Sequence, residues 1–505
     1  MKKVISLFLI FMIVFSLWAC NGSDGTATKD NATANTENNA TGSENGENGE
    51  NDAAGTAATG LQVGFNRQSI TPTEIGVPIA GGDSSARLST GFIDEVATTC
   101  IAFSMNEETY LIYTCDFMVV YDRVLDPVKV ALENATGVPQ SNIVFNCTHT
   151  HSGVNVYSDS WDGASAYREL FSKRCLKAAE KALADLAPAT ISYGSTQTEG
   201  MTFVRHYLMN DGTTSGNGHG SSASGYKEHL YPADEELQII KFTREGEKDI
   251  MIASFPSHAT TVNGTNSTSI SACYPGAFRE AVEEEADVHC AFFQGASGDQ
   301  VPTSKIDELN AVFPKNHKTY GKKLAEYALS VELKPMDTAK LVFKRWEYTG
   351  NSMKEGTEDI SRVAQAQEIV TLCSQKSGYT DPEVTALVNK YGFSGYLEAS
   401  GLVSRVKAPE TRSMDLLALQ LGSEVSMVFA PYEMFGMHGK YIKDNSPFEM
   451  DFIVTCSEDY QGYFPHILGC EENFYEYDVT KYERGTGEKL AELFATTLAE
   501  MKNAG

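Results

Sequence analysis

The sequence is short of basic residues. Its 505 residues include 40 Lys and Arg against 67 Asp and Glu, which gives a formal net charge of −27. Because a field of this sign repels phosphate backbones, we expect no nucleic-acid partner. The chain is otherwise ordinary, with 42% hydrophobic and 21% charged residues. That composition excludes wholesale disorder, a collagen-like chain and a disulfide-stapled miniprotein.

Paired cysteines and long apolar runs are also lacking. Nine cysteines follow Cys20, an odd number, and no two of them are spaced Cys-x-x-Cys. Most lie in apolar runs, so buried free thiols are expected rather than a disulfide framework or a cysteine zinc site. No stretch beyond the first twenty residues approaches the roughly 18 consecutive apolar residues of a membrane span.

The first twenty residues predict an export signal. Lys2 and Lys3 precede the apolar run Val4 to Trp18, which is short for a membrane span. Leu17-Trp18-Ala19-Cys20 then resembles a bacterial lipoprotein processing site. We expect residues 1–20 to be a lipoprotein signal peptide, and lipidated Cys20 to anchor the exported chain to the outer face of a bacterial membrane. An ordinary secretory signal cleaved nearby is the alternative.

Residues 21–60 almost lack hydrophobic side chains, so they cannot offset their ordering entropy and are expected to form a disordered low-complexity tether. In residues 61–505, strand and helix patterns alternate without a fixed repeat, which predicts one large α/β domain with a helical insert at about 351–410. Strand patterns cover 61–72, 96–103, 109–120, 142–151, 235–242, 250–255, 289–294, 416–421 and 425–429, and helix patterns cover 123–136, 164–184, 274–284, 316–329, 359–391 and 487–501.

The sharpest feature is the run Asn142-Ile-Val-Phe-Asn-Cys-Thr-His149-Thr-His151-Ser-Gly153. Alternate residues of a strand share a face, so His149 and His151 are expected to point the same way at its end. Two neutral imidazoles there suit a zinc site, or one ligand beside an acid–base or substrate-binding histidine; satisfied surface histidines are the alternative. His258 and Glu433 also follow predicted strands, where α/β folds place their sites.

These motifs resemble the neutral/alkaline (non-lysosomal) ceramidase family, of which His-Thr-His-Ser-Gly at a strand end is the hallmark. The similarity runs from Ser69-Ile-Thr-Pro72 to about Glu488. It implies that His149 binds zinc and that His151 lines the pocket beside the metal. Phe255-Pro-Ser-His258 and Pro431-Tyr-Glu433 match the motifs of the family's next two ligands.

The resemblance implies a tyrosine as the fourth ligand. Tyr460-Gln-Gly-Tyr463 matches its motif, which makes Tyr463 the ligand, and a pocket tyrosine follows twelve residues later as Tyr475. Phe203-Val-Arg205 fits the family's pocket arginine. From the residues alone, Tyr475 could equally be a stacked core aromatic and Arg205 a surface ion pair.

The resemblance implies a fold and a reaction. The fold is a single large α/β domain with two mixed β-sheets flanked by helices. The reaction is zinc-dependent hydrolysis of the N-acyl amide bond of ceramide or a related N-acyl lipid by a zinc-bound water. Tyr475 would stabilise the developing oxyanion with the zinc, His151 would pass a proton to the departing amine, and Arg205 would orient a substrate oxygen.

Three features depart from the family pattern. Val301 stands in Gly298-Asp299-Gln300-Val301-Pro302 where the family carries a serine, and Cys273 stands where relatives typically carry Asp. The sequence also stops at Gly505 without the family's immunoglobulin-like domain, so the lipid anchor is expected to supply proximity to a membrane substrate. Two alternatives therefore stay open: a zinc hydrolase of a different amide or ester, and a non-catalytic, ligand-binding surface lipoprotein on the same scaffold.

Overall fold

The fold is described by a computed structural model over residues 60–81, 87–159, 161–216, 225–262, 268–302, 317–336, 340–376, 378–468 and 474–504. The signal peptide, Cys20 and all but the last residue of the tether lie outside these ranges, so the predictions made for them stay predictions. None of the helices in the described ranges is long and apolar enough to cross a bilayer.

A mixed sheet of nine strands forms the centre of the body, in the order β14-β12-β11-β6-β1-β3-β4-β5 with β16 also paired to β6. The pairs β4–β5 and β12–β14 are parallel, and the other pairs are antiparallel. The strands are β1 Gln62–Ser69, β3 Ala97–Met105, β4 Glu108–Cys115, β5 Ile143–Cys147, β6 Ala187–Gln197, β11 Glu236–Arg244, β12 Ile250–Phe255, β14 His289–Gln294 and β16 Lys334–Met336.

A second mixed sheet packs on the first. Its order is β17-β18-β19-β21, and only the β19–β21 pair is parallel. One apolar cluster fills the space between the sheets, where the Phe293 and Phe452 rings meet edge to face at 6.0 Å. This burial holds the two sheets together. The strands are β17 Leu341–Asn351, β18 Thr411–Leu421, β19 Val425–Phe429 and β21 Met450–Val454.

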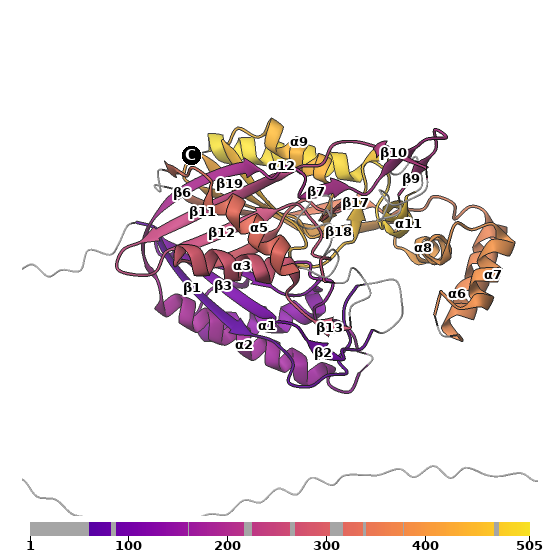
Figure 1. Ribbon diagram of the computed structural model, residues 1–505, viewed down its shortest axis with the longest axis horizontal. Coiled ribbons are helices and arrows are strands. Elements are labelled where there is room, and N and C mark those ends of the chain that lie inside the picture. The colour runs from indigo at the N-terminus through magenta and orange to yellow at the C-terminus, as the bar shows by residue number, and fades with distance from the viewer. Residues whose placement is uncertain are drawn as a thin grey trace, which may run out of the picture. The chain divides into compact units, whose positions relative to one another are not determined.

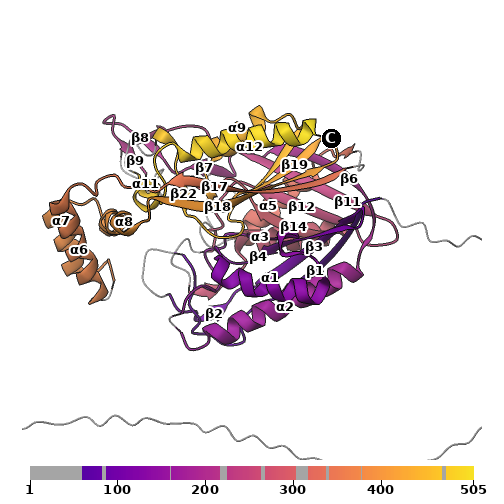
Figure 2. The same cartoon turned by 180° about the vertical axis from the view of Figure 1, so that it is seen from behind.

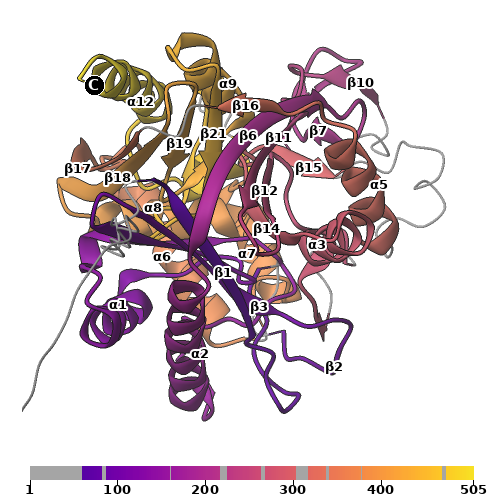
Figure 3. The ribbon, with the colours of Figure 1, turned by 90° about the vertical axis from the view of Figure 1, so that its left-hand side faces the viewer.

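Helices cover the outer faces of both sheets (Figure 1). The α1–α2 pair packs on the β3–β4–β5 side of the large sheet and the α3–α5 pair on its β12–β14 side, whereas α9 and α12 cover the second sheet (Figures 2 and 3). The expected α/β domain with two mixed sheets flanked by helices is therefore confirmed. These helices are α1 Asp122–Thr136, α2 Ala164–Ala184, α3 Cys273–Ala286, α5 His317–Leu329, α9 Gly436–Asn445 and α12 Thr486–Asn503.

Three further helices lie in the region where an insert is predicted: α6 Ile360–Ser374, α7 Pro382–Tyr391 and α8 Tyr396–Lys407. They share a small apolar cluster of their own. Asp359 and Asp381 cap α6 and α7 by accepting hydrogen bonds from Arg362 N and Glu383 N. The insert meets the body where α8 packs on the short helix α11, Tyr475–Val479 (Figure 2).

Short strands outside the two main sheets connect the loops near the ends of the long strands. They pair as β2 with β13, β7 with β15, β20 with β22, and β10-β8-β9. Their bounds are β2 Gly91–Phe92, β13 Ser269–Ile270, β7 Thr202–Val204, β15 Gln300–Pro302, β8 Tyr207–Met209, β9 Thr214–Ser215, β10 Tyr226–His229, β20 Glu433–Met434 and β22 Tyr463–Phe464.

Candidate metal centre

The two histidines of the His-Thr-His motif do not belong to the strand that precedes them. Strand β5 ends at Cys147, so the predicted strand through His151 is wrong. The chain turns away from the sheet after Thr148, because His149 has a left-handed backbone with φ of 60°. The turn still brings the Nε2 atoms of His149 and His151 to 3.2 Å. Strand alternation is therefore not what brings the two rings together.

His258 and Glu433 meet His149 from two other segments of the chain. His258 follows β12, and its backbone N–H donates to Gln300 O at 3.0 Å. Glu433 Oε2 lies 3.3 Å from His149 Nε2 and 3.1 Å from His258 Nε2. All three side chains are buried, and His151 beside them is half-buried. The ring nitrogens of the three histidines lie within 4.8 Å of one another, so this group could hold a metal ion.

Tyr463 joins the same centre. The short parallel pair β20–β22 sets Tyr463 directly opposite Glu433. Its hydroxyl lies 3.5 Å from His258 Nε2. All four residues matched to metal ligands in the sequence therefore have their donor atoms at one point, although they come from four separate segments of the chain.

The hydrogen-bond partners of the two histidines favour a cation at this point. His149 Nδ1 faces Met118 O at 2.9 Å, and His258 Nδ1 faces Ser297 O at 2.7 Å. A carbonyl oxygen only accepts, so each Nδ1 carries a proton, and each ring in its neutral form presents a lone pair at Nε2. Two lone pairs and a carboxylate oxygen then meet within hydrogen-bond distance, an arrangement that a divalent cation stabilises.

The electrostatics show that this point attracts positive charge: against the effect of burial, Cys456 and Glu433 raise the pKa of His149 well above its ordinary value. Burial alone would raise the pKa of the Glu433 carboxyl, but His149 and His258 outweigh it and hold the pKa well below its ordinary value. Burial, followed by the neighbouring His149 and His258, lowers the pKa of His151 well below its ordinary value. The centre therefore combines an ionised carboxylate with a neutral His151, which suits a cation and a proton acceptor beside it.

Two supporting side chains were not predicted as part of the site. Tyr460 donates its hydroxyl proton to Glu433 Oε1 at 2.5 Å, which leaves Oε2 facing the histidines. Cys456 Sγ lies 3.4 Å from His149 Nδ1. Tyr460 opens the Tyr-x-x-Tyr motif and could have been found there, whereas nothing in the sequence marks Cys456.

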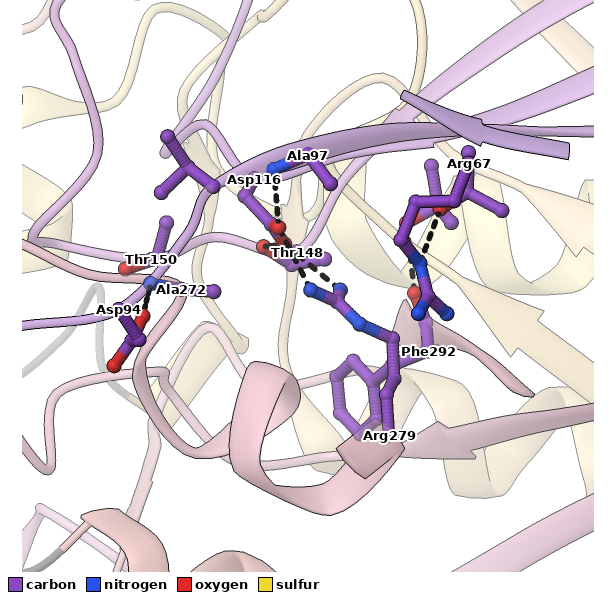
Figure 4. A network of polar contacts seen from close by, with 12 residues as sticks. Arg67, Asp94, Ala97, Asp116, Thr148, Thr150, Ala272, Arg279 and Phe292 are labelled. Atoms are coloured by element: carbon purple, nitrogen blue, oxygen red, sulfur yellow. Dashed lines mark hydrogen bonds and ion pairs between the residues drawn. The ribbon is translucent and has the colours of Figure 1, made fainter. Parts of the chain in front are cut away.

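A buried ion pair supports the segment before His149 (Figure 4). Arg279 of α3 donates to both carboxylate oxygens of Asp116, at 2.8 and 2.7 Å. Asp116 also accepts hydrogen bonds from the Thr148 hydroxyl at 3.1 Å and from Ala97 N at 2.8 Å. Asp116 follows β4 directly, so the pair ties the end of β4 to the residue that precedes His149.

Arg205 is neither a surface ion pair nor an unpaired pocket residue. Its Nε donates to Glu476 Oε1 at 2.8 Å and its Nη2 to Gly298 O at 2.8 Å, and Glu476 is fully buried. The guanidinium lies 5.7 Å from the centre of the Tyr463 ring. Arg205 thus lies beside the metal centre, and its guanidinium N–H groups donate to Glu476 and Gly298 of the protein itself. Tyr475 begins α11, but its side chain lies outside what the structure describes.

Val301 lies beside the segment that holds His258. It is half-buried in β15, opposite Phe203 of β7. The preceding residue, Gln300, accepts from His258 N through its carbonyl oxygen. Cys273, the other departure from the family pattern, is buried with its Sγ 3.1 Å from the Thr261 hydroxyl.

Comparisons with known proteins relate the fold to solved structures. No family model matches the chain, and no curated protein matches it. The neutral ceramidase from Pseudomonas aeruginosa superposes with a TM-score of 0.62 at 15% identity, covering 89% of this chain and 75% of that one. A ceramidase complexed with C2 gives 0.63 at 16% identity, covering 88% and 76%. The chain therefore shares the fold of these ceramidases.

Proposed function

We propose that this chain is a zinc-dependent amidohydrolase that cleaves the N-acyl amide bond of ceramide or a related N-acyl lipid. The observation that carries the proposal is that the donor atoms of His149, His258, Glu433 and Tyr463 each lie 3.1–3.5 Å from at least one other of the four. Two imidazole nitrogens, a carboxylate and a phenol form a donor set compatible with zinc. The fold that carries this centre is shared with neutral ceramidases.

When bound, zinc supplies Lewis-acid activation of water and of an acyl carbonyl. The chain's own residues prepare the centre for it. The carbonyl contacts at Nδ1 keep the Nε2 lone pairs of His149 and His258 directed inward. Tyr460 holds Glu433 through the other carboxylate oxygen.

His151 is the candidate for proton transfer. Its lowered pKa keeps the imidazole neutral, so that it can accept a proton from the nucleophile and pass it to the departing amine. The buried Nδ1 of His151 has no hydrogen-bond partner in the described part of the chain. Since Nε2 faces His149 Nε2 at 3.2 Å, Nδ1 is the nitrogen left for proton transfer.

The proposal is tested on the full chain by measuring zinc content and fatty-acid release from a fluorescent ceramide. His149→Ala and Glu433→Gln should lose both zinc and turnover, because each removes a donor from the centre. His289→Gln is the matched control, since His289 lies at the start of β14, stacked on Phe65 at 4.6 Å. Full turnover by zinc-free protein would overturn the proposal.

Val301 favours a second candidate, hydrolysis of another amide or an ester at the same centre. Valine offers no hydroxyl at the position that the family fills with serine. A substrate that makes no hydrogen bond at this position would therefore suit the centre better than ceramide. A panel of N-acyl amides and esters separates the two candidates, because turnover of ceramide alone would exclude the second. The third candidate is a non-catalytic, ligand-binding role. It is excluded if the wild-type chain turns over a substrate and His149→Ala does not.

We propose further that the chain is an exported lipoprotein anchored through Cys20. The sequence around Cys20 supports this, because a charged start and an apolar run precede Leu-Trp-Ala-Cys. Expression in a bacterium with labelled palmitate should label the wild-type chain and not Cys20→Ala. Equal labelling of the two would contradict the anchor and leave the enzymatic proposal untouched.

A further inference from the structure

A cleft of about 660 Å³ lies between the helical insert and the rest of the body. Thr385 of α7 and Tyr396 and Glu398 of α8 line one wall. Ser215 of β9, Phe474 and Asp478 line the other. The volume falls in the range of small-molecule sites. None of the metal-centre residues lines this cleft, so it is a separate space.

The charge of the cleft has one sign. Among the residues that the structure describes, two carboxylate side chains line it and no lysine or arginine does, although the charge of Arg405 acts on Asp478 from behind the wall. Glu398 is already compensated, because Arg362 Nη2 donates to it at 2.7 Å and Ser394 N at 2.7 Å. The carboxylate of Asp478 accepts no hydrogen bond from the residues that the structure describes. Burial, followed by the charge of Glu398, raises the pKa of Asp478 to about 7. A cation in the cleft would stabilise the ionised form.

The backbone holds Asp478 firmly in the wall. Gly401 of α8 packs on it so closely that a Cβ at this position would lie 2.1 Å from Asp478 O. Arg405 of the same helix donates to Tyr477 O at 2.9 Å. The junction of α8 and α11 therefore fixes the backbone of Asp478 at the place where insert and body meet.

The rest of the lining is suited to an apolar group. The Tyr379 and Tyr396 rings are stacked with centroids 5.6 Å apart and planes 11° from parallel. Val388 and Leu397 lie beside them, and Phe474 closes the opposite wall. Aromatic faces attract organic cations as well as alkyl chains. An amphiphilic ammonium compound would satisfy both parts of this lining.

Phe474 also connects the cleft to the metal centre. Its ring lies 4.3 Å from that of His206, whose Nε2 is 3.0 Å from Glu476 Oε2. Glu476 holds Arg205, which lies against the Tyr463 ring. A series of side-chain contacts thus runs from the cleft to the metal centre.

We propose that the cleft between the insert and the body binds a primary organic ammonium ion that carries an aliphatic chain, with Asp478 as its counter-ion. The protein itself would make such an ion, an inference that rests on the proposed function. In amide hydrolysis the C–N bond breaks, the acyl carbon gains the OH of water, and the nitrogen gains its hydrogen. At neutral pH the amine then binds a proton and the acid loses one. The cleft attracts the cationic product and repels the anionic one.

The test is calorimetric titration of the full chain at pH 7.5 with octylamine, octanol and octanoate, all below their aggregation concentrations. Octylamine should bind at least about tenfold more tightly than the other two, because it alone is cationic at this pH. Asp478→Asn should weaken octylamine binding about tenfold or more. Thr385→Arg tests the same cleft from an exposed position on α7 and should abolish the preference for the amine.

Two controls separate this inference from the proposed function. Glu358→Gln removes an equal charge from an exposed position of the insert outside the cleft, and should leave amine binding unchanged. His149→Ala should also leave it unchanged while abolishing turnover. Two results would overturn the proposed amine site. One is equal binding of octylamine and octanol, and the other is undiminished amine binding in both Asp478→Asn and Thr385→Arg. Amine binding that is lost in His149→Ala would place the amine at the metal centre instead and would also overturn it.

Discussion

The buried pair of Asp116 and Arg279 is predicted to be strongly coupled, and to be costly when only one partner remains. Asp116 is 0% exposed and Arg279 is 4% exposed. Burial alone would lower the pKa of the Arg279 guanidinium, but Asp116 outweighs it and the pKa is raised. Arg279→Met keeps most of the apolar stem and removes the charge, so it isolates the ionic contribution.

The magnitude follows from what each variant leaves behind. Arg279→Met leaves the Asp116 carboxylate buried with only the hydrogen bonds from Thr148 and Ala97. Removing one partner of a buried pair costs about 3–5 kcal/mol in the free energy of unfolding. Asp116→Asn together with Arg279→Met removes both charges and keeps an amide oxygen for Ala97 N, so the double variant should lose only about 1–3 kcal/mol.

Urea unfolding of the two single variants and the double variant measures the coupling as a double-mutant cycle, with an expected value of at least about 2 kcal/mol. Lys440→Met is the control, because its pair with Asp444 on α9 is 62% and 56% exposed. Such a pair contributes less than about 1 kcal/mol. If the two single losses simply add in the double variant, the buried pair does not have the role assigned to it.

Two further predictions concern a buried acid and a close glycine. Burial raises the pKa of Asp451 to about 6 against the hydrogen bonds of Ser426 and Ser446, so its stabilising contribution is complete at low pH and is lost as the pH rises through 6. Urea unfolding should therefore show that the stability of Asp451→Asn rises relative to the wild type by about 2 kcal/mol between pH 4 and pH 7, and a pH-independent difference would contradict this. A Cβ on Gly81 would lie 2.7 Å from His151 Nδ1 at a φ of 79°, so Gly81→Ala should lower turnover at least about tenfold with zinc retained. Gly137→Ala, which has a φ of 76° and nothing within 4 Å of the Cβ, should not, and unchanged turnover in Gly81→Ala would refute the contact.

Much of the local structure could be predicted from the sequence because its signals are local. The strands at 250–255 and 289–294 and the helix at 164–184 have the predicted bounds. The β3–β4 hairpin turns at Asn106 and Glu107, both with positive φ, as a tight turn requires. Strand order could not be predicted in this way. The pairing of β1 with both β3 and β6 joins segments far apart in the chain, and the two-sheet arrangement came only from the family resemblance.

The strand end at the His-Thr-His motif shows where the local rule fails. Alternation predicts a common face for His149 and His151 only while the backbone stays extended. At His149 the backbone is no longer extended, because its φ is 60°. This conformation costs conformational free energy for a non-glycine residue, so it persists only where the surrounding contacts impose it. Thr148 N bonds to Cys115 O and the Thr148 side chain to Asp116, and these contacts impose it here. They come from β4 and the residue after it, so no window around the motif contains them.

The same distinction separates the ligands of the candidate centre from its support. Ligand types are visible in a sequence because imidazole, carboxylate and phenol are properties of side chains. The groups that orient His149 and His258 are carbonyl oxygens of Met118, Ser297 and Gln300, and every residue has such a group. Their positions depend on the path of the backbone, not on residue type. Substitutions at these three positions should therefore leave the ligand geometry unchanged wherever the backbone keeps its conformation. The orientation of the ligands is set by the fold and not by the sequence motif.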